Sequence, residues 1–504
     1  MNLLQPIKKR KKARVGIYSA GLSVYWEQFE GLRERLHGYG QFIEKKLEDH
    51  AEIFYYGIVD SESEGRKAGE WFNQNNVDIV FCHAATYFTT SSILPVHQIC
   101  SKPVIVLNLQ PTDQINYEHT STGEWLAHCG ACPVPEISNA FNRSNIKFRV
   151  ISGLLGLEET PSISLTNECT FEMDEAISAW NEIMEWVRAA SVIRTLQYSR
   201  FGFLGNTYSG MLDMYSDFTM VQAQTGIHIE VLEMCDLQKM VNEVTGTQVK
   251  EKLKEVYSMF QISEDSSADP IAKRPTEEQM VWSSKVAVAQ ERLVKEFDLD
   301  SLTYYYHSTP GHEYEKLQSG FILGNSLLTA RGIPCAGEGD LKTAIAMKIC
   351  DILETGGSFC EIVVVDYRDK TILLGHDGPF HIAIADGKPV LRGMGLYHGK
   401  VGSGISVEAK VKTGPITTLN VTQTVEGKLK LISSEGISTD GPTMKIGNTQ
   451  TPVKFLKHPD RYMDEWFSHA PTHHCAMAIG HNASVFKKVS ELLNLEHVII
   501  SQEA

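Results

Sequence analysis

The stretch Ala13-Arg-Val-Gly-Ile-Tyr-Ser-Ala-Gly21 predicts a buried β-strand that ends in a glycine turn. Its run of apolar side chains is typical of a strand that is covered on both faces. A helical stretch is expected next, from Trp26 to about Leu47, followed by similar strands at 51–59, 77–82 and 103–108. Continuous apolar strands that alternate with helices predict a parallel, doubly wound sheet. Ligands of such sheets bind beyond the carboxyl ends of the strands.

A second series of the same kind begins after a long helix expected at about 172–195. The segment Arg200-Phe-Gly-Phe-Leu-Gly205 predicts a strand and turn, and further strands are expected at 227–232 and 301–306. The glycines of the first segment lack the full pattern of a nucleotide-binding loop, so we interpret them as a strand-to-helix turn.

The pattern changes after about residue 360. Short strand-like segments such as ISVEAKVKTG and ITTLNVTQTVEGKLKLISSEG alternate apolar and polar residues, as antiparallel strands with one wet face do. The fold class predicted is therefore α/β, with two doubly wound, Rossmann-like α/β domains followed by a β-rich, barrel-like C-terminal domain. The boundaries predicted are 1–175, 176–328 and 329–504.

Composition narrows the classes of function. A chain of 504 residues is too long for a single hydrophobic core, so several domains are expected. The formal net charge of −15 disfavours nucleic-acid binding. The basic run Lys8–Lys12 is interpreted as a solvated tail, with nuclear import or phosphate binding as the alternative. No apolar stretch is long enough to span a bilayer. The ten cysteines are scattered, many in apolar runs, which is typical of reduced thiols in a cytoplasmic protein.

The first candidate for chemistry is the segment Gly337-Glu338-Gly339-Asp340, which precedes a well-formed helix. Flanking glycines allow unusual backbone angles and keep a carboxylate accessible. The competing interpretation is a plain helix cap, in which Asp340 or Glu338 accepts hydrogen bonds from the first amides of the helix.

Three further segments carry metal-ligating residue types. Glu361 enters an apolar strand, His376 follows the strand TILL, and His473-His474 precedes the apolar run AMAIG. Asp366, at the other end of its strand, competes with Glu361 for the role of ligand. Two carboxylates and two histidines suit Mn²⁺, with Mg²⁺ or Co²⁺ as alternatives, although spacings this long are weak evidence alone.

The pair Cys129-Gly-Ala-Cys132 is compatible with a redox pair or half of a zinc site. The chain has no second C-x-x-C segment, and Pro133 follows the pair directly. A pocket-lining loop or a pair of buried thiols is the favoured interpretation.

These segments together resemble the L-arabinose isomerase family. GEGDLKTA resembles the family's AEGDWKTA-type segment, SFCE its SFMEDY, LLGHDG its LGAHM, and THHCAMAIG its GGAHHTVFS. The four segments occur in the family's order and at similar spacing. A fainter likeness covers the rest of the chain. The related L-fucose isomerases share the fold and the same kind of metal site.

The resemblance implies a function and a site. It implies an aldose–ketose isomerase whose metal ligands are Glu338, Glu361, His376 and His474, and whose His473 faces the sugar. Glu338 and Glu361 are expected to share the proton transfer between C1 and C2 through an enediolate, with a hydride shift as the competing mechanism. The resemblance also implies a homohexamer or other homo-oligomer with the active site at a subunit boundary.

The sugar-tail residues, meaning those expected to contact the sugar away from the metal, differ from the residues that the family has there. Its SQHLYG-type and NQSAHG segments each carry a glutamine, and the corresponding positions here hold Ser23 and Cys129. Since unpaired polar groups discriminate strongly between substrates, we expect a sugar other than L-arabinose: another pentose, a hexose or a deoxy sugar. Replacement contacts are expected from the following residues, for each of which ordinary packing is the alternative: Tyr25, Trp26, His83, His128 and Tyr304–Tyr306. The competing functions are an epimerase that uses the same metal site and a non-catalytic sugar-binding protein on the same fold.

Overall fold

The computed structural model describes residues 5–8, 10–265, 269–307, 311–394 and 404–500. The chain forms two compact units, one of residues 11–194 and one of residues 1–10 together with 195–504. Each unit is described by itself. The three-domain division with boundaries near 175 and 328 stays a prediction.

The unit of residues 11–194 is built on a parallel five-stranded sheet in the order β2-β1-β3-β4-β5. Its strands are β1 (Arg14–Ala20), β2 (Glu52–Val59), β3 (Ile79–Ala84), β4 (Val104–Gln110) and β5 (Phe148–Leu154). Its helices are α1 (Leu32–Leu47), α2 (Glu62–Gln74), α3 (Thr90–Ile99), α4 (Thr122–Ala127), α5 (Val134–Arg143) and the start of α6 (Asp174–Gln197). The doubly wound sheet predicted from the sequence is confirmed.

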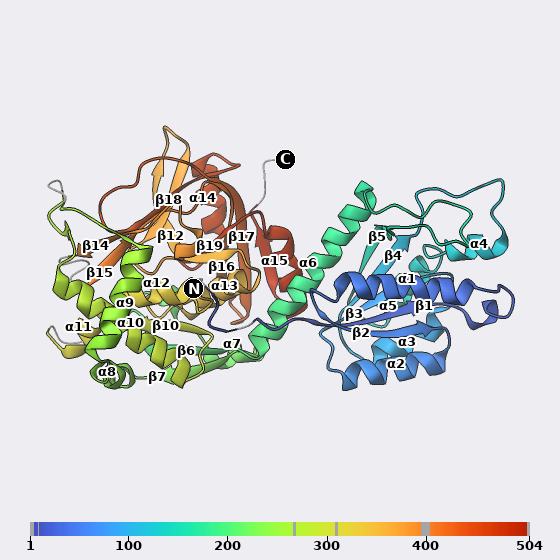
Figure 1. The fold of residues 1–504 in the computed structure, drawn as a ribbon, viewed down its shortest axis with the longest axis horizontal. Coiled ribbons are helices and arrows are strands. Elements are labelled where there is room, and N and C mark those ends of the chain that lie inside the picture. The colour runs from blue at the N-terminus through green and yellow to red at the C-terminus, as the bar shows by residue number, and fades with distance from the viewer. Residues whose placement is uncertain (1–4, 9, 266–268, 308–310, 395–403, 501–504) are drawn as a thin grey trace. The chain divides into compact units, whose positions relative to one another are not determined.

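Residues of β1 approach helices on both faces of this sheet; Figure 1 shows these helices. A Cβ atom at Gly16 would lie 2.8 Å from the ring of Phe72 on α2, so this face needs a residue without a side chain. On the other face, a Cβ atom at Gly40 of α1 would lie 2.5 Å from the Ser19 hydroxyl. Small residues therefore let the helices approach the sheet closely.

Two local features of this unit differ from the prediction. The helix expected from Trp26 begins only at Leu32. Gly31, the residue before it, has a left-handed φ of 81°, and a right-handed helix cannot continue through that conformation. A 3-10 turn, η1 (Ser23–Tyr25), occupies the first part instead. Strand β5 was not predicted, since its sequence FRVISGL lacks a continuous apolar run.

The other unit contains a second parallel sheet in the order β11-β10-β6-β7. Its strands are β6 (Arg200–Gly205), β7 (His228–Leu232), β10 (Ser301–Tyr305) and β11 (Cys335–Ala336). The helices around it are η2 (Leu212–Met214), α7 (Phe218–Thr225), α8 (Met234–Asn242), α9 (Gly246–Met259), α10 (Glu277–Glu296), α11 (Glu313–Ser319), α12 (Phe321–Thr329) and α13 (Leu341–Ile352). The second α/β series predicted from the sequence is confirmed.

The β-rich part of this unit is a closed barrel, as predicted (Figure 1). The strand order β16-β19-β12-β13-β18-β17 closes because β16 also pairs with β17, and β20 adds to β17 in parallel. The strands are β12 (Gly356–Asp366), β13 (Thr371–His376), β16 (Gly414–Gln423), β17 (Leu429–Ser438), β18 (Thr449–Phe455), β19 (His474–Ile479) and β20 (Glu496–Ile499). Helices α14 (Pro459–Ser468) and α15 (Ala483–Leu493) complete it, and a small sheet contains β8 (Gln261–Ile262), β9 (Ala272–Lys273), β14 (Val390–Met394) and β15 (Ile405–Glu408).

The basic segment near the N-terminus is paired with acidic residues of its own unit. Lys8 Nζ lies 2.8 Å from Asp298 and 3.2 Å from Asp300, and Arg10 forms ion pairs with Asp351 and Glu354. These contacts correct the interpretation of a solvated tail for these two residues, because carboxylates of the fold neutralise them. Within the described parts of the chain, no helix combines the length and apolar character that crossing a membrane requires.

Candidate metal centre

Strand pairing in the barrel brings three of the four predicted ligands together. Glu361, in the middle of β12, is directly opposite His474 on β19 and opposite Gly375 on β13, the residue before His376. Side chains of directly opposite residues in an antiparallel pair are neighbours on one face of the sheet. The register therefore places His474 and His376 on the two strands that flank Glu361.

The fourth residue, Glu338, comes from the loop between β11 and α13. Its φ of 61° is left-handed, which is uncommon for a residue with a side chain. Hydrogen bonds on both sides hold this conformation: Tyr208 N–H donates to the Glu338 carbonyl at 2.9 Å, and Gly339 N–H donates to the Tyr304 carbonyl at 2.9 Å. A Cβ atom at Gly339 would lie 2.3 Å from the carbonyl oxygen of Asn206, so only glycine fits.

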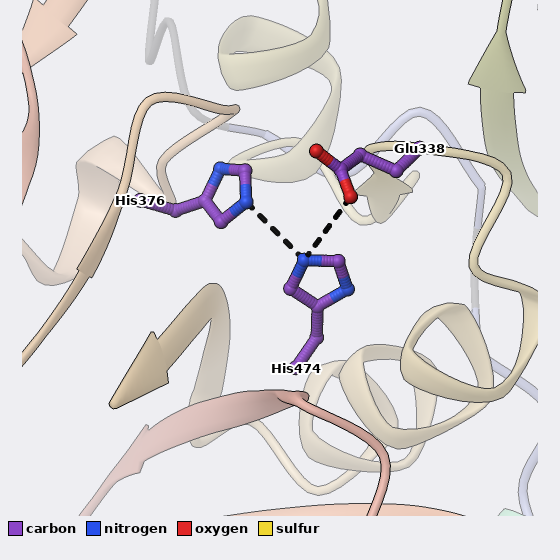
Figure 2. A group of neighbouring side chains, drawn as sticks. All are labelled: Glu338, His376 and His474. Carbon is purple, nitrogen blue, oxygen red and sulfur yellow. Dashed lines mark hydrogen bonds and ion pairs between the residues drawn. The ribbon is translucent and has the colours of Figure 1, made fainter. Parts of the chain in front are cut away.

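The side chains of Glu338, His376 and His474 converge on one point (Figure 2). The Nε2 atoms of His376 and His474 are 3.2 Å apart, and Oε2 of Glu338 is 3.7 Å from Nε2 of His474. Glu361 Oε1 lies 3.9 Å from Nε2 of His376. Glu338, His376 and His474 thus form one group of ligand-type side chains, and Glu361 forms an overlapping group with His473 and His474. The roles of all these residues stay predictions.

The outer nitrogen of each imidazole faces a carboxylate. His474 Nδ1 lies 3.0 Å from Oδ2 of Asp340, and His376 Nδ1 lies 2.9 Å from Oδ1 of Asp377. Such partners fix the orientation of a ligating imidazole, so that its other nitrogen points at the ion. Asp340 is also the N-cap of α13, where it accepts the Thr343 N–H at 2.9 Å. Asp340 therefore caps α13, as one interpretation of the sequence proposed, and the same side chain also orients His474.

The glutamates and histidines of the centre shift one another's pKa values. Burial raises the pKa of Glu338, but the nearby imidazoles of His473, His474 and His376 lower it by more, so the pKa lies below its usual value. Burial lowers the pKa of His474, which favours the neutral imidazole that a metal ion requires. Burial also lowers the pKa of His376, but Asp377 and the two glutamates outweigh it and the pKa is raised.

The donor set fits a divalent cation. Oε2 of Glu338 is buried and accepts no hydrogen bond within the described part of the chain. Two imidazole nitrogens facing each other at 3.2 Å are close to the roughly 3 Å that separates two ligands at right angles, given metal–nitrogen bonds of about 2.0–2.1 Å. Mixed carboxylate and imidazole ligation suits Mn²⁺ and related cations.

The neighbouring His473 is oriented by a residue that sequence reasoning missed. Asp213 Oδ2 accepts the His473 backbone N–H at 2.9 Å and lies 2.7 Å from its Nδ1, while Nε2 of the same ring lies 3.8 Å from Glu338. The two carboxylates overcome the effect of burial and raise the pKa of His473 to about 9. Asp213 lies 260 residues away in the chain, within none of the recognisable segments, so no local signal pointed to it.

A cavity of about 450 Å³ lies at the carboxyl ends of β6 and β10, beside the Glu338 loop. Its lining is aromatic and neutral, apart from one histidine, and consists of Phe203, Asn206, Thr207, Ser209, Tyr215, Tyr305 and His307. Tyr304 and Tyr305 were both among the predicted sugar contacts. Tyr305 lines this cavity, but Tyr304 is buried and packs against Phe321. The position agrees with the rule that open parallel sheets bind ligands beyond their carboxyl ends.

The rival ligand Asp366 lies away from the centre. It is exposed at the far end of β12, five residues from Glu361, and accepts the backbone N–H of Asp369 at 2.9 Å. Five residues of strand span about 17 Å, so Asp366 caps the turn after β12 and does not reach the histidines.

Apart from Tyr304–Tyr306, the predicted sugar-tail residues belong to the unit of residues 11–194. His83, at the end of β3, is buried, and its Nδ1 lies 3.0 Å from the Ser19 hydroxyl. Burial raises the pKa of Tyr25, with smaller contributions from Cys129, Tyr87 and Cys132. Ser23 is exposed on η1. The contacts of these residues with a sugar stay predictions.

Cys129 is buried but Cys132 is exposed, so the interpretation of the C-x-x-C pair as two buried thiols is wrong for Cys132. Burial and the neighbouring Cys132 raise the pKa of Cys129 to about 11, which opposes formation of the reactive thiolate. Among the described residues, no cysteine belongs to a group of metal-ligating side chains.

A second cluster of ligand-type residues, Glu124, His128 and Glu168, is already neutralised. Arg35 lies between the two carboxylates and forms ion pairs with both, and all three charged side chains are buried. Because the guanidinium fills the place of a cation, we assign this cluster a structural role.

The fold and site define an α/β protein with a barrel-borne histidine–carboxylate centre. Comparison with known proteins adds a family: residues 215–356 match the model of the L-arabinose isomerase central domain. The chain is 24% identical over 332 residues to an L-arabinose isomerase of Herpetosiphon aurantiacus, and 22% identical over 337 residues to one of Saccharophagus degradans. Each match spans 64% of this chain and 64% of the relative. These findings show that the chain is similar to L-arabinose isomerases over part of its length.

Proposed function

We propose that this protein is a metal-dependent isomerase that interconverts an aldose and a ketose. The observation that carries the proposal is the convergence of Glu338, His376 and His474 on one point, with Oε1 of Glu361 3.9 Å from Nε2 of His376 beside them. The likeness to L-arabinose isomerases supplies the class of reaction.

The four residues would hold Mn²⁺, or alternatively Mg²⁺ or Co²⁺. Bound there, the cation would polarise the sugar carbonyl and stabilise negative charge on the neighbouring oxygens. Asp340 and Asp377 would keep the two imidazoles aimed at it.

The chain's own residues would carry the proton. One of the two glutamates would take the proton from the carbon beside the carbonyl, and the other would return a proton to the neighbouring position. The lowered pKa of Glu338 keeps it ionised and able to accept a proton at neutral pH. His473, held by Asp213, would donate a hydrogen bond to a sugar oxygen.

The substrate proposed is a pentose, hexose or deoxy sugar other than L-arabinose, because Ser23 and Cys129 replace two amides of the family's segments. We further propose a homohexamer or another homo-oligomer with the site at a subunit boundary. A cytoplasmic location is proposed as well, and the ten free cysteines support it.

A panel of aldoses in deuterated water tests the proposal. Protein stripped with EDTA is compared with protein reloaded with Mn²⁺, and ketose and solvent deuterium are measured by NMR. Ketose that carries deuterium is expected only with the metal. Epimerised aldose without ketose would indicate an epimerase, and no conversion of any sugar by Mn²⁺-loaded protein would contradict the proposed function.

A further inference from the structure

The inference concerns the segment between β6 and α7, which carries Asp213 on the short 3-10 helix η2. This segment is fastened to the Glu338 loop at several points. Tyr208 N–H donates to the Glu338 carbonyl at 2.9 Å, and Lys342 Nζ donates to the Tyr215 carbonyl at 2.9 Å. Since these bonds do not involve Asp213, its side chain can be changed without releasing the segment.

Asp213 contacts His473 at two atoms with a single oxygen. Its Oδ2 accepts the His473 backbone N–H at 2.9 Å and lies 2.7 Å from Nδ1. The two nitrogens of an imidazole point in opposite directions, so a carboxylate at Nδ1 determines where Nε2 points. Here Nε2 faces Glu338 Oε2 at 3.8 Å, and the ring packs against that of His474 with centroids 3.8 Å apart.

His473 needs such a partner because its surroundings do not fix it. A third of its side chain is exposed, in contrast to the fully buried His474. A partly exposed histidine can occupy other staggered rotamers, and each of them would turn Nε2 away from Glu338. The carboxylate of Asp213 is therefore the contact that selects the rotamer.

We propose that Asp213 is a positioning residue of this centre: it holds His473 so that Nε2 faces Glu338 and the substrate's oxygen atoms. The proposal rests on the proposed isomerase function. It assigns a role to a segment that the four recognisable motifs leave out, and it links the loop after β6 to the geometry of the barrel-borne site.

A double-mutant cycle on the Mn²⁺-loaded full chain tests the role. We expect Asp213→Ala to lower kcat/KM by ten- to a hundredfold, the usual effect of removing a partner of this kind. His473→Ala should lower it at least as much, and the double variant should match His473→Ala alone, because Asp213 acts through that ring. Asp213→Asn, which keeps an acceptor oxygen, should recover most of the loss. Independent, multiplying effects of the two single variants would overturn the proposal.

Two further measurements separate positioning from a general loss of structure. Asp217→Ala is the matched control: it removes a carboxylate from the same segment, where Asp217 only caps α7 by accepting the Met220 N–H at 3.0 Å, and it should leave kcat/KM within about twofold. Mn²⁺ affinity of Asp213→Ala should stay within about threefold of wild type, because no ligand is removed.

A crystal structure of Asp213→Ala with Mn²⁺ alone gives a result that does not depend on activity. The His473 ring should occupy another rotamer while the four ligands keep their places. An unmoved ring would overturn the proposal even if the isomerase function holds. A wild type that converts no sugar would instead contradict the proposed function, and the ring's rotamer would still decide whether Asp213 positions it.

Discussion

Oδ2 of Asp340 lies 3.0 Å from Nδ1 of His474, and both side chains are fully buried. The same carboxylate accepts the backbone N–H and the hydroxyl of Thr343 at the start of α13. The helix cap and the orientation of the histidine therefore depend on one side chain, which ties the β11–α13 loop to the barrel.

The Asp340–His474 contact predicts a specific effect on metal binding. Asp340→Ser keeps an N-cap of similar quality but removes the carboxylate from the imidazole. We expect Mn²⁺ affinity to fall by about ten- to a hundredfold, measured by calorimetric titration. Asp217→Ser makes the same change at the N-cap of α7 and should leave the affinity unaltered. Equal affinities of the two variants would contradict the role given to Asp340.

Gly339 predicts a cost in folding stability. A Cβ atom there would meet the Asn206 carbonyl at 2.3 Å, and φ is 73°. The control, Gly210→Ala, has φ of 96° but nothing within 4 Å of its Cβ, so it pays only the conformational cost of about 1 kcal/mol. Gly339→Ala should lower the free energy of unfolding by clearly more, about 3 kcal/mol, in urea titrations. Equal losses would mean that the contact with Asn206 does not constrain this loop.

The buried Arg35 predicts a large effect in the unit of residues 11–194. Arg35→Met leaves the carboxylates of Glu124 and Glu168 buried without their cation, which should cost about 3–5 kcal/mol. Arg66→Met removes one exposed partner of Glu62 and should cost about 0.5 kcal/mol or less. Thermal melts of both variants compare the two, and similar melting temperatures would argue against the structural role of this cluster.

His97 predicts how stability changes with pH. Burial lowers its pKa to about 3, whereas an unfolded histidine titrates near about 6.5. The unfolded state therefore binds the proton first, and stability falls as the pH drops below about 6.5, by up to about 1.4 kcal/mol per pH unit for one proton. His97→Leu should flatten this slope in urea titrations between pH 6.5 and pH 4. The exposed His119→Leu serves as control, and identical slopes for both would show that His97 is not the responsible group.

The sequence predicted the arrangement of strands better than the exact ends of helices. Continuous apolar runs identified β1, β3 and β4 because burial on both faces leaves a strong signal. The helix expected from Trp26 begins at Leu32. The left-handed conformation of Gly31, which sets this start, does not alter the pattern of apolar residues, so the pattern did not indicate it. The edge strand β5 was missed for a similar reason, because only two of its seven residues are buried.

The site was predictable where its residues lie in ordered motifs. Glu338, Glu361, His376 and His474 were proposed from such motifs. The barrel register explains why the strands that carry Glu361, His376 and His474 are neighbours, whereas Glu338 comes from the loop between β11 and α13. Asp213 was not predictable, since its contact with His473 joins positions 260 residues apart.

The most direct test of the account compares two carboxylates of the same strand. Initial rates of ketose formation are measured on addition of Mn²⁺ to EDTA-stripped Glu361→Gln and Asp366→Asn, with the aldose that the wild type converts. We predict that Glu361→Gln loses at least about a hundredfold in rate, as expected for a proton-transfer group, while Asp366→Asn stays within about twofold of wild type. Full metal-dependent activity in Glu361→Gln would contradict the central claim that Glu338, Glu361, His376 and His474 form the catalytic centre.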